Sequence, residues 1–205
     1  MTPRIHPPVC IVLLAAGGAV RFGSAKQMIA IGGVAMVRHC ALNAIGSREH
    51  VVVVTGAYRE DVETALHGLD LTAIHNAEWN VGMGSSIACG IGVVEQDATV
   101  EAAIILLADQ PLVSGDDLNE LIAQHRKYPD CIIAASAQNG TIMPPCLFPR
   151  RFFPELRTLR DQNGARAILQ RHADCIVAVE MPNAAVDIDT QEAYAQFCVS
   201  QQPHD

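Results

Sequence analysis

The sequence predicts a single-domain α/β protein in which a doubly wound, mostly parallel (mixed) sheet lies between two layers of helices. The 205 residues fit one large domain. Half of the residues are hydrophobic and 18% are charged, so the chain has ample material for a core. Apolar, strand-like runs alternate with helical patterns at intervals of about thirty residues, the size of a strand–helix–strand unit. We therefore expect residues 1–205 to form one domain.

The first half of the chain shows this alternation most regularly. Its apolar runs end at glycine or polar residues, and the first run is apolar enough to be buried on both faces of a sheet. In chain order we expect a strand at 9–16, a loop to 33, a helix at 36–45, a strand at 50–55, a helix at 59–66, a strand at 71–75, a loop at 76–84, a helix at 85–94 and a strand at 102–108.

The second half is less regular. Ser114 is a plausible N-cap for a helix that ends near Lys127. Residues 143–145, Met-Pro-Pro, are expected to resist regular structure, and residues 146–148 to pair at a sheet edge, because proline cannot donate to a central ladder. Further elements are expected as a strand at 131–136, a turn at 138–141, helices at 150–159 and 163–172, a strand at 176–179, and a last helix through 199 with Asp189 or Thr190 as its N-cap.

The loop after the first strand carries the strongest chemical signal. Gly17, Gly18 and Gly23 let the backbone approach a ligand closely, and Arg21 and Lys26 add two cations to the same loop. Backbone N–H groups and fixed cations are what a polyphosphate requires. A tight strand-to-helix connection with two solvated basic residues is the alternative. In a doubly wound sheet, ligands bind at the carboxyl ends of the strands, where this loop lies.

Three aspartates are candidate metal ligands. Asp109 ends an apolar strand at the same edge, where an acid cannot be buried without a partner. Mg²⁺ prefers carboxylate oxygens and leaves room for substrate phosphates. Asp187 and Asp189 point to one side if Ile188 is extended, and would complete the site. The alternatives are a turn cap at Asp109 and a simple helix N-cap at Asp189.

Charge and composition exclude several classes of function. The net charge of −8 argues against general nucleic-acid binding, and no apolar run reaches the length of about 18 residues that spans a membrane. The start of the chain does not resemble a secretory signal. The seven cysteines form no CxxC pair and the eight histidines no HxxxH spacing, so we expect reduced, mostly buried thiols, histidines mainly at the surface and a cytoplasmic protein.

Together these motifs resemble the MobA/MocA-like nucleotidyltransferases, especially the molybdenum-cofactor cytidylyltransferase branch with its Rossmann-like fold. The resemblance runs from the first strand to the last helix, with all motifs in order. They are LAAG at 14–17, RFG at 21–23, KQ at 26–27, VTG at 54–56, Asn76 and Trp79 followed by GMGSS at 82–86, DQP at 109–111, GAR at 164–166 and DIDT at 187–190.

The resemblance implies transfer of a nucleoside monophosphate from an NTP, with CTP favoured, to a phosphorylated acceptor, favoured to be molybdopterin, with release of pyrophosphate. Mg²⁺, or alternatively Mn²⁺, would be the cofactor, and a xanthine-dehydrogenase-family enzyme or its maturation factor a partner. Arg21, Lys26 and Asp109 would be catalytic, with Asp109, Asp189 and Asp187 as metal ligands. The nucleotide-binding residues would be Leu14, Ala15, Ala16, Gly17, Gly18, Arg21, Lys26, Thr55, Gly56, Ser85, Ser86 and Asp109. The acceptor-binding residues would be Gly140, Pro145 and Arg166.

Departures from the family pattern leave alternatives open. Met143-Pro144-Pro145 replaces the usual Gly-His-Pro on the acceptor side, which allows another phosphorylated acceptor, and GTP remains an alternative to CTP. Ala16 with the GMGSS segment favours the cytidylyl branch. A non-catalytic chaperone that hands cofactor to a molybdoenzyme is a further alternative. A dinucleotide-dependent oxidoreductase is disfavoured because the chain lacks GxGxxG after the first strand and an acid at the end of the second.

Overall fold

A computed structural model describes residues 8–18, 22 and 25–200 of the chain. Its core is one seven-stranded sheet in the order β5-β4-β1-β6-β8-β7-β9. All neighbouring strands run parallel except β8, which is antiparallel to both β6 and β7. The strands are β1 (Val9–Ala15), β4 (His50–Thr55), β5 (Thr72–His75), β6 (Ala102–Leu107), β7 (Ile132–Ser136), β8 (Ile142–Pro149) and β9 (Ile176–Glu180).

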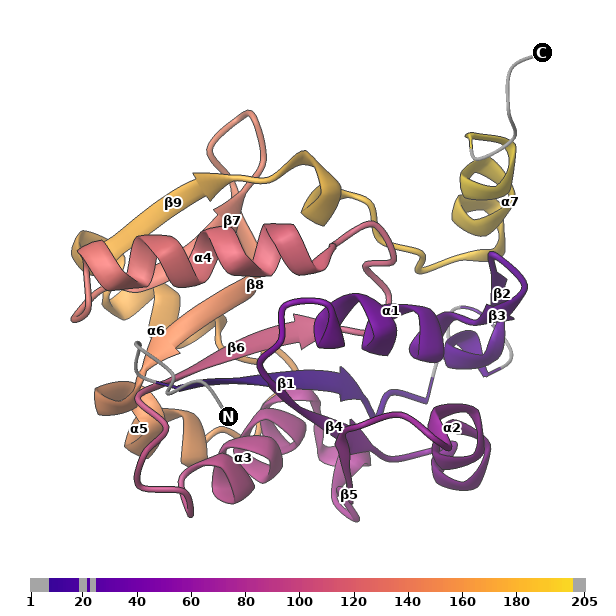
Figure 1. Cartoon of the computed structure of the whole chain (residues 1–205), viewed down its shortest axis with the longest axis horizontal. Coiled ribbons are helices and arrows are strands. Elements are labelled where there is room, and N and C mark those ends of the chain that lie inside the picture. Colours follow the sequence, from indigo (N-terminus) through magenta and orange to yellow (C-terminus); the bar gives the residue numbers. More distant parts are fainter. Residues whose placement is uncertain (1–7, 19–21, 23–24, 201–205) are drawn as a thin grey trace.

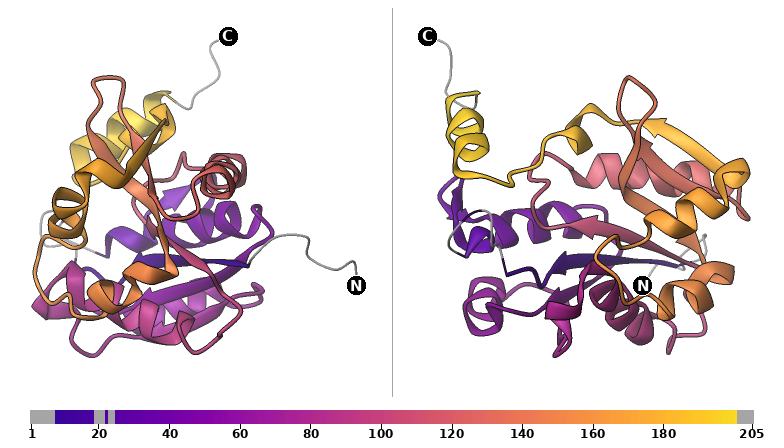
Figure 2. Two further views of the ribbon diagram at one scale, coloured as in Figure 1. Left: turned by 90° about the vertical axis from the view of Figure 1, so that its left-hand side faces the viewer. Right: turned by 180° about the vertical axis from the view of Figure 1, so that it is seen from behind.

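Helices cover both faces of this sheet, which confirms the predicted fold class (Figures 1 and 2). One face carries α1 (Met36–Ile45), α2 (Arg59–Leu66) and α4 (Gly115–Lys127). The other carries α3 (Met83–Val94), α5 (Phe153–Arg157) and α6 (Arg166–Arg171). The last helix, α7 (Gln191–Ser200), stands beside the small hairpin β2 (Ala30–Ile31) and β3 (Val34–Ala35) (Figure 1). No helix in the described ranges is long and apolar enough to cross a membrane.

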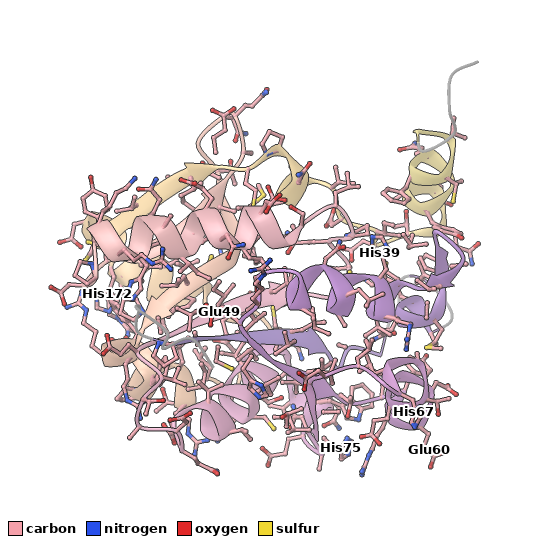
Figure 3. All side chains as sticks on the ribbon, in the orientation of Figure 1. His39, Glu49, Glu60, His67, His75 and His172 are labelled. Carbon is pink, nitrogen blue, oxygen red and sulfur yellow. The ribbon has the colours of Figure 1, made fainter. Side chains whose placement is uncertain are left out.

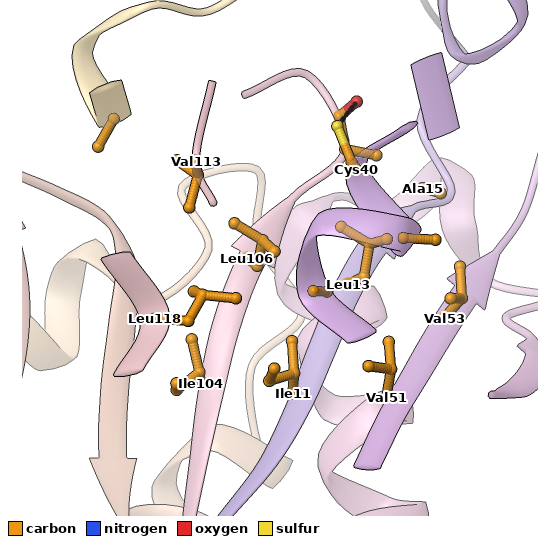
Figure 4. Close-up of a cluster of buried hydrophobic side chains, with 14 of the residues drawn as sticks. Ile11, Leu13, Ala15, Cys40, Val51, Val53, Ile104, Leu106, Val113 and Leu118 are labelled. Carbon is orange, nitrogen blue, oxygen red and sulfur yellow. Dashed lines mark hydrogen bonds between the residues drawn. The ribbon is translucent and has the colours of Figure 1, made fainter. Parts of the chain in front are cut away.

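The central strands divide their side chains between two cores. Alternate residues of a strand point to opposite faces, so Ile11 and Leu13 of β1 pack under α1 and α4 while Val12 packs under α3. Figure 4 shows the first of these clusters, in which Ile11 and Leu13 lie between side chains of β4 and β6. Ile11, Val12 and Leu13 are fully buried, as expected for a strand covered on both faces.

Most predicted elements form within one or two residues of their expected bounds. The N-cap at Ser114 is confirmed as part of a capping box, in which its hydroxyl accepts from the backbone N–H of Asp117 and the Asp117 carboxylate accepts from the N–H of Ser114. The cap of the last helix is also resolved. Thr190 Oγ1 accepts from the N–H of Ala193 at 3.1 Å, so Thr190 caps α7. The helix expected at 163–172 begins only at Arg166.

The expectation that residues 143–145 resist regular structure is wrong. They lie in β8, which is an interior strand between β6 and β7 and not an edge strand. The ladder to β7 pairs Ala135 with Met143 and Ala134 with Cys146, so Pro144 and Pro145 form an irregularity with no partner of their own. Because these two residues need no ladder bond, proline's missing N–H costs nothing there.

Helix α3 packs unusually close to the sheet at Gly90. A Cβ at this position would lie 2.4 Å from Cγ1 of Val12 and 3.1 Å from Cγ2 of Val54. Glycine in a helix costs about 1 kcal/mol relative to alanine. The close approach of α3 to β1 and β4 explains why position 90 is a glycine.

We expect Gly90→Ala to lower the free energy of unfolding by about 1–3 kcal/mol, despite the better helix propensity of alanine, because the new methyl overpacks the core. Adding Val12→Ala should make room for that methyl. In urea unfolding the double variant should therefore lose clearly less stability than the sum of the two single losses. Additive losses, within about 0.5 kcal/mol, would contradict this packing.

Candidate functional site

A cleft of about 500 Å³ opens at the edge where β1 and β6 end, within the size range of small-ligand sites. The carboxyl ends of these two parallel strands point the same way (Figure 1). This location confirms the edge at which the sequence places its motifs. The lining comes from segments that are far apart in the chain: residues 14–18, Phe22, Lys26, Gln27, Met36, Trp79, Asn80, Gly82, Met83, Ser86, residues 107–109, Gln162 and Asp189.

Three charged residues meet in this cleft. The Nζ atom of Lys26 donates to Oδ2 of Asp109 at 2.8 Å and to Oδ1 of Asp189 at 2.7 Å. The side chains are 14%, 20% and 31% exposed, respectively, so water screens them only partly. A turn cap at Asp109 and a helix cap at Asp189, the two alternatives, would not account for these contacts with Lys26. Asp187 lies next to this cluster in sequence but is exposed and does not line the cleft.

Backbone contacts hold the two aspartates together. The N–H of Ile188 donates to the carbonyl of Asp109 at 3.0 Å, which fixes the chain just before Asp189 against the end of β6. The buried Gln110 amide donates at 2.8 Å to the carbonyls of both Pro144 and Ala184. Gln110 thus ties β6 to β8 and to the segment that leads into Asp189.

Burial raises the pKa of Asp109, and the Lys26 ammonium opposes that rise while the carboxylates of Asp189 and Asp187 add to it. For Lys26, burial lowers the pKa, but the two carboxylates outweigh it and the pKa is raised. Lys26 therefore stays a cation at neutral pH, as a phosphate-binding lysine must.

The carboxylates suit a divalent metal ion. Asp109 Oδ1 is buried and has no hydrogen-bond partner. Hard cations such as Mg²⁺ and Mn²⁺ take such oxygens, and Mg²⁺ commonly binds one or two carboxylates together with substrate phosphates. Within the described ranges no group of three or more His, Cys, Asp or Glu side chains is placed to hold a metal by itself. The residues present therefore fit a metal whose remaining ligands come from water and substrate.

Polar contacts of Gln27 fix the backbone at the start of the glycine loop. Gln27 Nε2 donates to the carbonyls of Ala15 and Gly17 at 3.3 and 2.6 Å. Gln27 belongs to the KQ motif at 26–27, but the sequence did not predict these contacts with Ala15 and Gly17. Of the residues predicted to bind nucleotide, 14–18 line the cleft and Arg21 lies outside the described residues. Thr55 and Gly56 do not line it. The Thr55 hydroxyl donates to the carbonyl of Ile74.

A buried polar cluster supports the start of α3. Asn76 Nδ2 donates to the hydroxyls of Ser85 and Ser86, at 2.9 and 3.1 Å. Ser86 lines the cleft, whereas Ser85 lies behind it and donates to backbone carbonyls of Glu78 and Gly82. Ser86 is thus the serine placed to meet a ligand.

Trp79 and Met83 belong to the motif at 76–86, but the sequence did not predict that they line the cleft together with Asn80 and Gln162. The Trp79 ring lies against Gly18, where a Cβ would be 3.0 Å from the ring. Gly82 has φ +146°, and a Cβ there would lie 2.5 Å from the carbonyl oxygen of Asp161, so glycine is required where residues 79–83 meet residues 161–162. A tryptophan in a loop at the ligand edge was the available signal.

The predicted acceptor residues do not line this cleft. Gly140 is exposed in the turn before β8, Pro145 is buried within β8, and Arg166 is exposed at the start of α6. The structure does not bring these three residues together with the charged cluster, and their function stays a prediction.

Histidines and cysteines form no second site in the described part of the chain. His39 lies on α1 and His75 on β5, while His67 and His172 come directly after α2 and α6 (Figure 3). All seven cysteines are free thiols, as expected. The expectation that most are buried is wrong, since only Cys10, Cys40 and Cys146 are.

Comparison with known proteins identifies the family of this chain. A family model, the MobA-like NTP transferase domain, matches residues 11–176. The purine catabolism protein PucB of Bacillus subtilis is 31% identical over 196 residues, which cover 89% of this chain and 92% of PucB.

Two solved structures share the fold. Rv0371c of Mycobacterium tuberculosis in complex with manganese superposes with a TM-score of 0.73 at 21% identity, covering 94% of this chain and 99% of that one. CMP:2-keto-3-deoxy-manno-octonic acid synthetase complexed with CTP gives 0.74 at 16% identity, covering 94% and 98%. With the family match and the similarity to PucB, the chain belongs to the MobA-like NTP transferase family.

Proposed function

We propose that the protein is a Mg²⁺-dependent nucleotidyltransferase that moves a nucleoside monophosphate from CTP to a phosphorylated acceptor, favoured to be molybdopterin, and releases pyrophosphate. The observation that carries this proposal is the cluster of Lys26, Asp109 and Asp189, which lines the same cleft as residues 14–18 at the start of the glycine loop. The cleft combines a cation, two metal-binding carboxylates and backbone amides, which together suit a metal-bound triphosphate.

Phosphoryl-group transfer depends on positioning and on cations near the phosphate oxygens, so no nucleophilic side chain is required. A phosphate oxygen of the acceptor attacks the α-phosphorus, the bond to the β-phosphate breaks, and pyrophosphate leaves. Lys26 and Arg21 would hold the triphosphate, while Asp109 and Asp189 would hold the metal. The bound metal supplies charge neutralisation at the phosphates. Residues 14–18 would contact the base, with Ser86 at the base or ribose.

Several observations support the finer assignments. A structural neighbour is described with CTP and another with manganese. Ala16 with GMGSS at 82–86 resembles the cytidylyl branch. PucB is named a purine catabolism protein. Xanthine is a purine, which favours a xanthine-dehydrogenase-family enzyme as the partner that receives the product. Because Met143-Pro144-Pro145 departs from the family pattern, another phosphorylated acceptor is the second candidate.

The two C-terminal aspartates should differ in function. We expect Asp189→Asn to lower kcat for pyrophosphate release by about 100-fold or more, comparable to loss of one group that stabilises developing charge. Asp187→Asn, which changes an exposed residue outside the cleft, should stay within about threefold of the original protein. Equal losses in the two variants would show that Asp187 also holds the metal.

Pyrophosphate release from CTP with a molybdopterin-type acceptor should require a divalent cation. EDTA should abolish it, and Mg²⁺ or Mn²⁺ should restore it, because a metal held by Asp109 and Asp189 would neutralise charge on the phosphates. GTP and ATP serve as matched nucleotides in the same assay. Activity that survives complete metal removal would contradict the metal assignment, and faster turnover with GTP would reassign the base.

A further inference from the structure

A single ammonium group occupies the place between the two carboxylates that would hold the metal. Lys26 Nζ lies 2.8 Å from Asp109 Oδ2 and 2.7 Å from Asp189 Oδ1, so it bridges side chains from segments far apart in the sequence. Two carboxylates brought this close repel each other unless a cation lies between them. Lys26 is that cation in this structure.

The match between the ammonium and this place is incomplete. Lys26 contacts Oδ2 of Asp109, but Oδ1 of the same carboxylate remains buried without a hydrogen-bond partner. A divalent cation held by the same carboxylates would neutralise both of their charges, and Asp109 Oδ1 could serve as one of its ligands. The cluster therefore provides for a doubly charged ion more fully than for a lysine.

We propose that Lys26 competes with the metal for Asp109 and Asp189, and that the triphosphate relieves this competition by giving the displaced ammonium a new anionic partner. The inference rests on the proposed function, because it takes the metal and an NTP as the ligands of this cleft. Metal and nucleotide then favour each other's binding, and by linkage the factor is the same in both directions.

The local structure suits a side chain that moves while its backbone stays. Lysine carries a compact charge on a flexible four-carbon stem. Its neighbour Gln27 is buried and bonded to the carbonyls of Ala15 and Gly17, which ties the backbone at this point to the glycine loop. Lys26 and residues 14–18 line the same cleft, so the ammonium reaches from the carboxylates toward a triphosphate held by the loop.

Removing the ammonium should therefore strengthen metal binding. We expect Lys26→Met, which keeps the length of the side chain, to bind Mn²⁺ alone about tenfold or more tightly than the original protein, measured by electron paramagnetic resonance of the free ion. The same variant should bind metal-free CTP more weakly, measured calorimetrically in EDTA. The chain has two lysines, and the other, Lys127, is exposed at the end of α4. Lys127→Met is the matched control and should change neither affinity.

Thermal unfolding of the same proteins controls for folding. Lys26→Met leaves two carboxylates without their cation, so its midpoint should fall in EDTA and rise more with Mn²⁺ than that of the original protein. Mn²⁺ affinity in Lys26→Met that is equal to or weaker than in the original protein would overturn the competition. The manganese measurement contains no nucleotide or acceptor. Pyrophosphate release by the original protein, with no gain in Mn²⁺ affinity in Lys26→Met, would therefore overturn this inference alone. A gain in Mn²⁺ affinity in Lys26→Met, with no nucleotide transfer by the original protein, would overturn the proposed function.

A second measurement needs no variant. With ¹⁵N-labelled lysine, the ammonium of Lys26 should give an exchange-protected Nζ signal in the metal-free protein, because it is partly buried and donates two hydrogen bonds. Exposed Lys127 should give none. Saturating Mg²⁺ with CTP should shift this signal. An unchanged Lys26 signal in the fully liganded protein would also overturn the competition.

Discussion

The contact of Lys26 with Asp109 and Asp189 is the constraint on which the cleft depends. It joins residues that are 83 and 163 positions apart, from the beginning, middle and end of the described chain. None of the three charges is well placed in isolation, since burial of an unpaired charge is costly. Together they form a charged cluster at the edge of the sheet, where apolar side chains could be buried without the cost of desolvating charges. A partly buried cluster of charges is typical of a ligand-binding site.

The sequence predicted the central sheet well because its signals are local. The apolar runs of β1, β4 and β6 are buried on both faces, and a glycine or an aspartate follows each strand within two residues. The prolines of β8 misled the prediction because their place depends on partners elsewhere. Pro144 and Pro145 fall between the pairs that β8 makes with β7, and that register is not visible in the residues themselves.

The site divides in the same way. The aspartates could be proposed from their positions at strand and helix ends, but local rules offered both a cap and a metal ligand for Asp189. The fold shows that Thr190 caps α7 through the N–H of Ala193, three residues further on, and that Asp189 contacts Lys26, 163 residues away in the sequence. Metal binding by Asp189 is proposed from that position. The wall of Trp79, Met83 and Gln162 was missed because it joins two loops that only the fold brings together. Most of the residues proposed to bind the nucleotide therefore line the cleft, whereas the three proposed to bind the acceptor do not.

The central claim is that this cleft takes a nucleoside triphosphate together with a divalent cation. The most direct test is the thermal midpoint of the full chain with each of the four NTPs, in Mg²⁺ and in EDTA. The account predicts that CTP raises the midpoint strongly in Mg²⁺ and much less in EDTA, with smaller shifts for the other nucleotides. Equal stabilisation with and without the metal, or no stabilisation by any NTP, would contradict it.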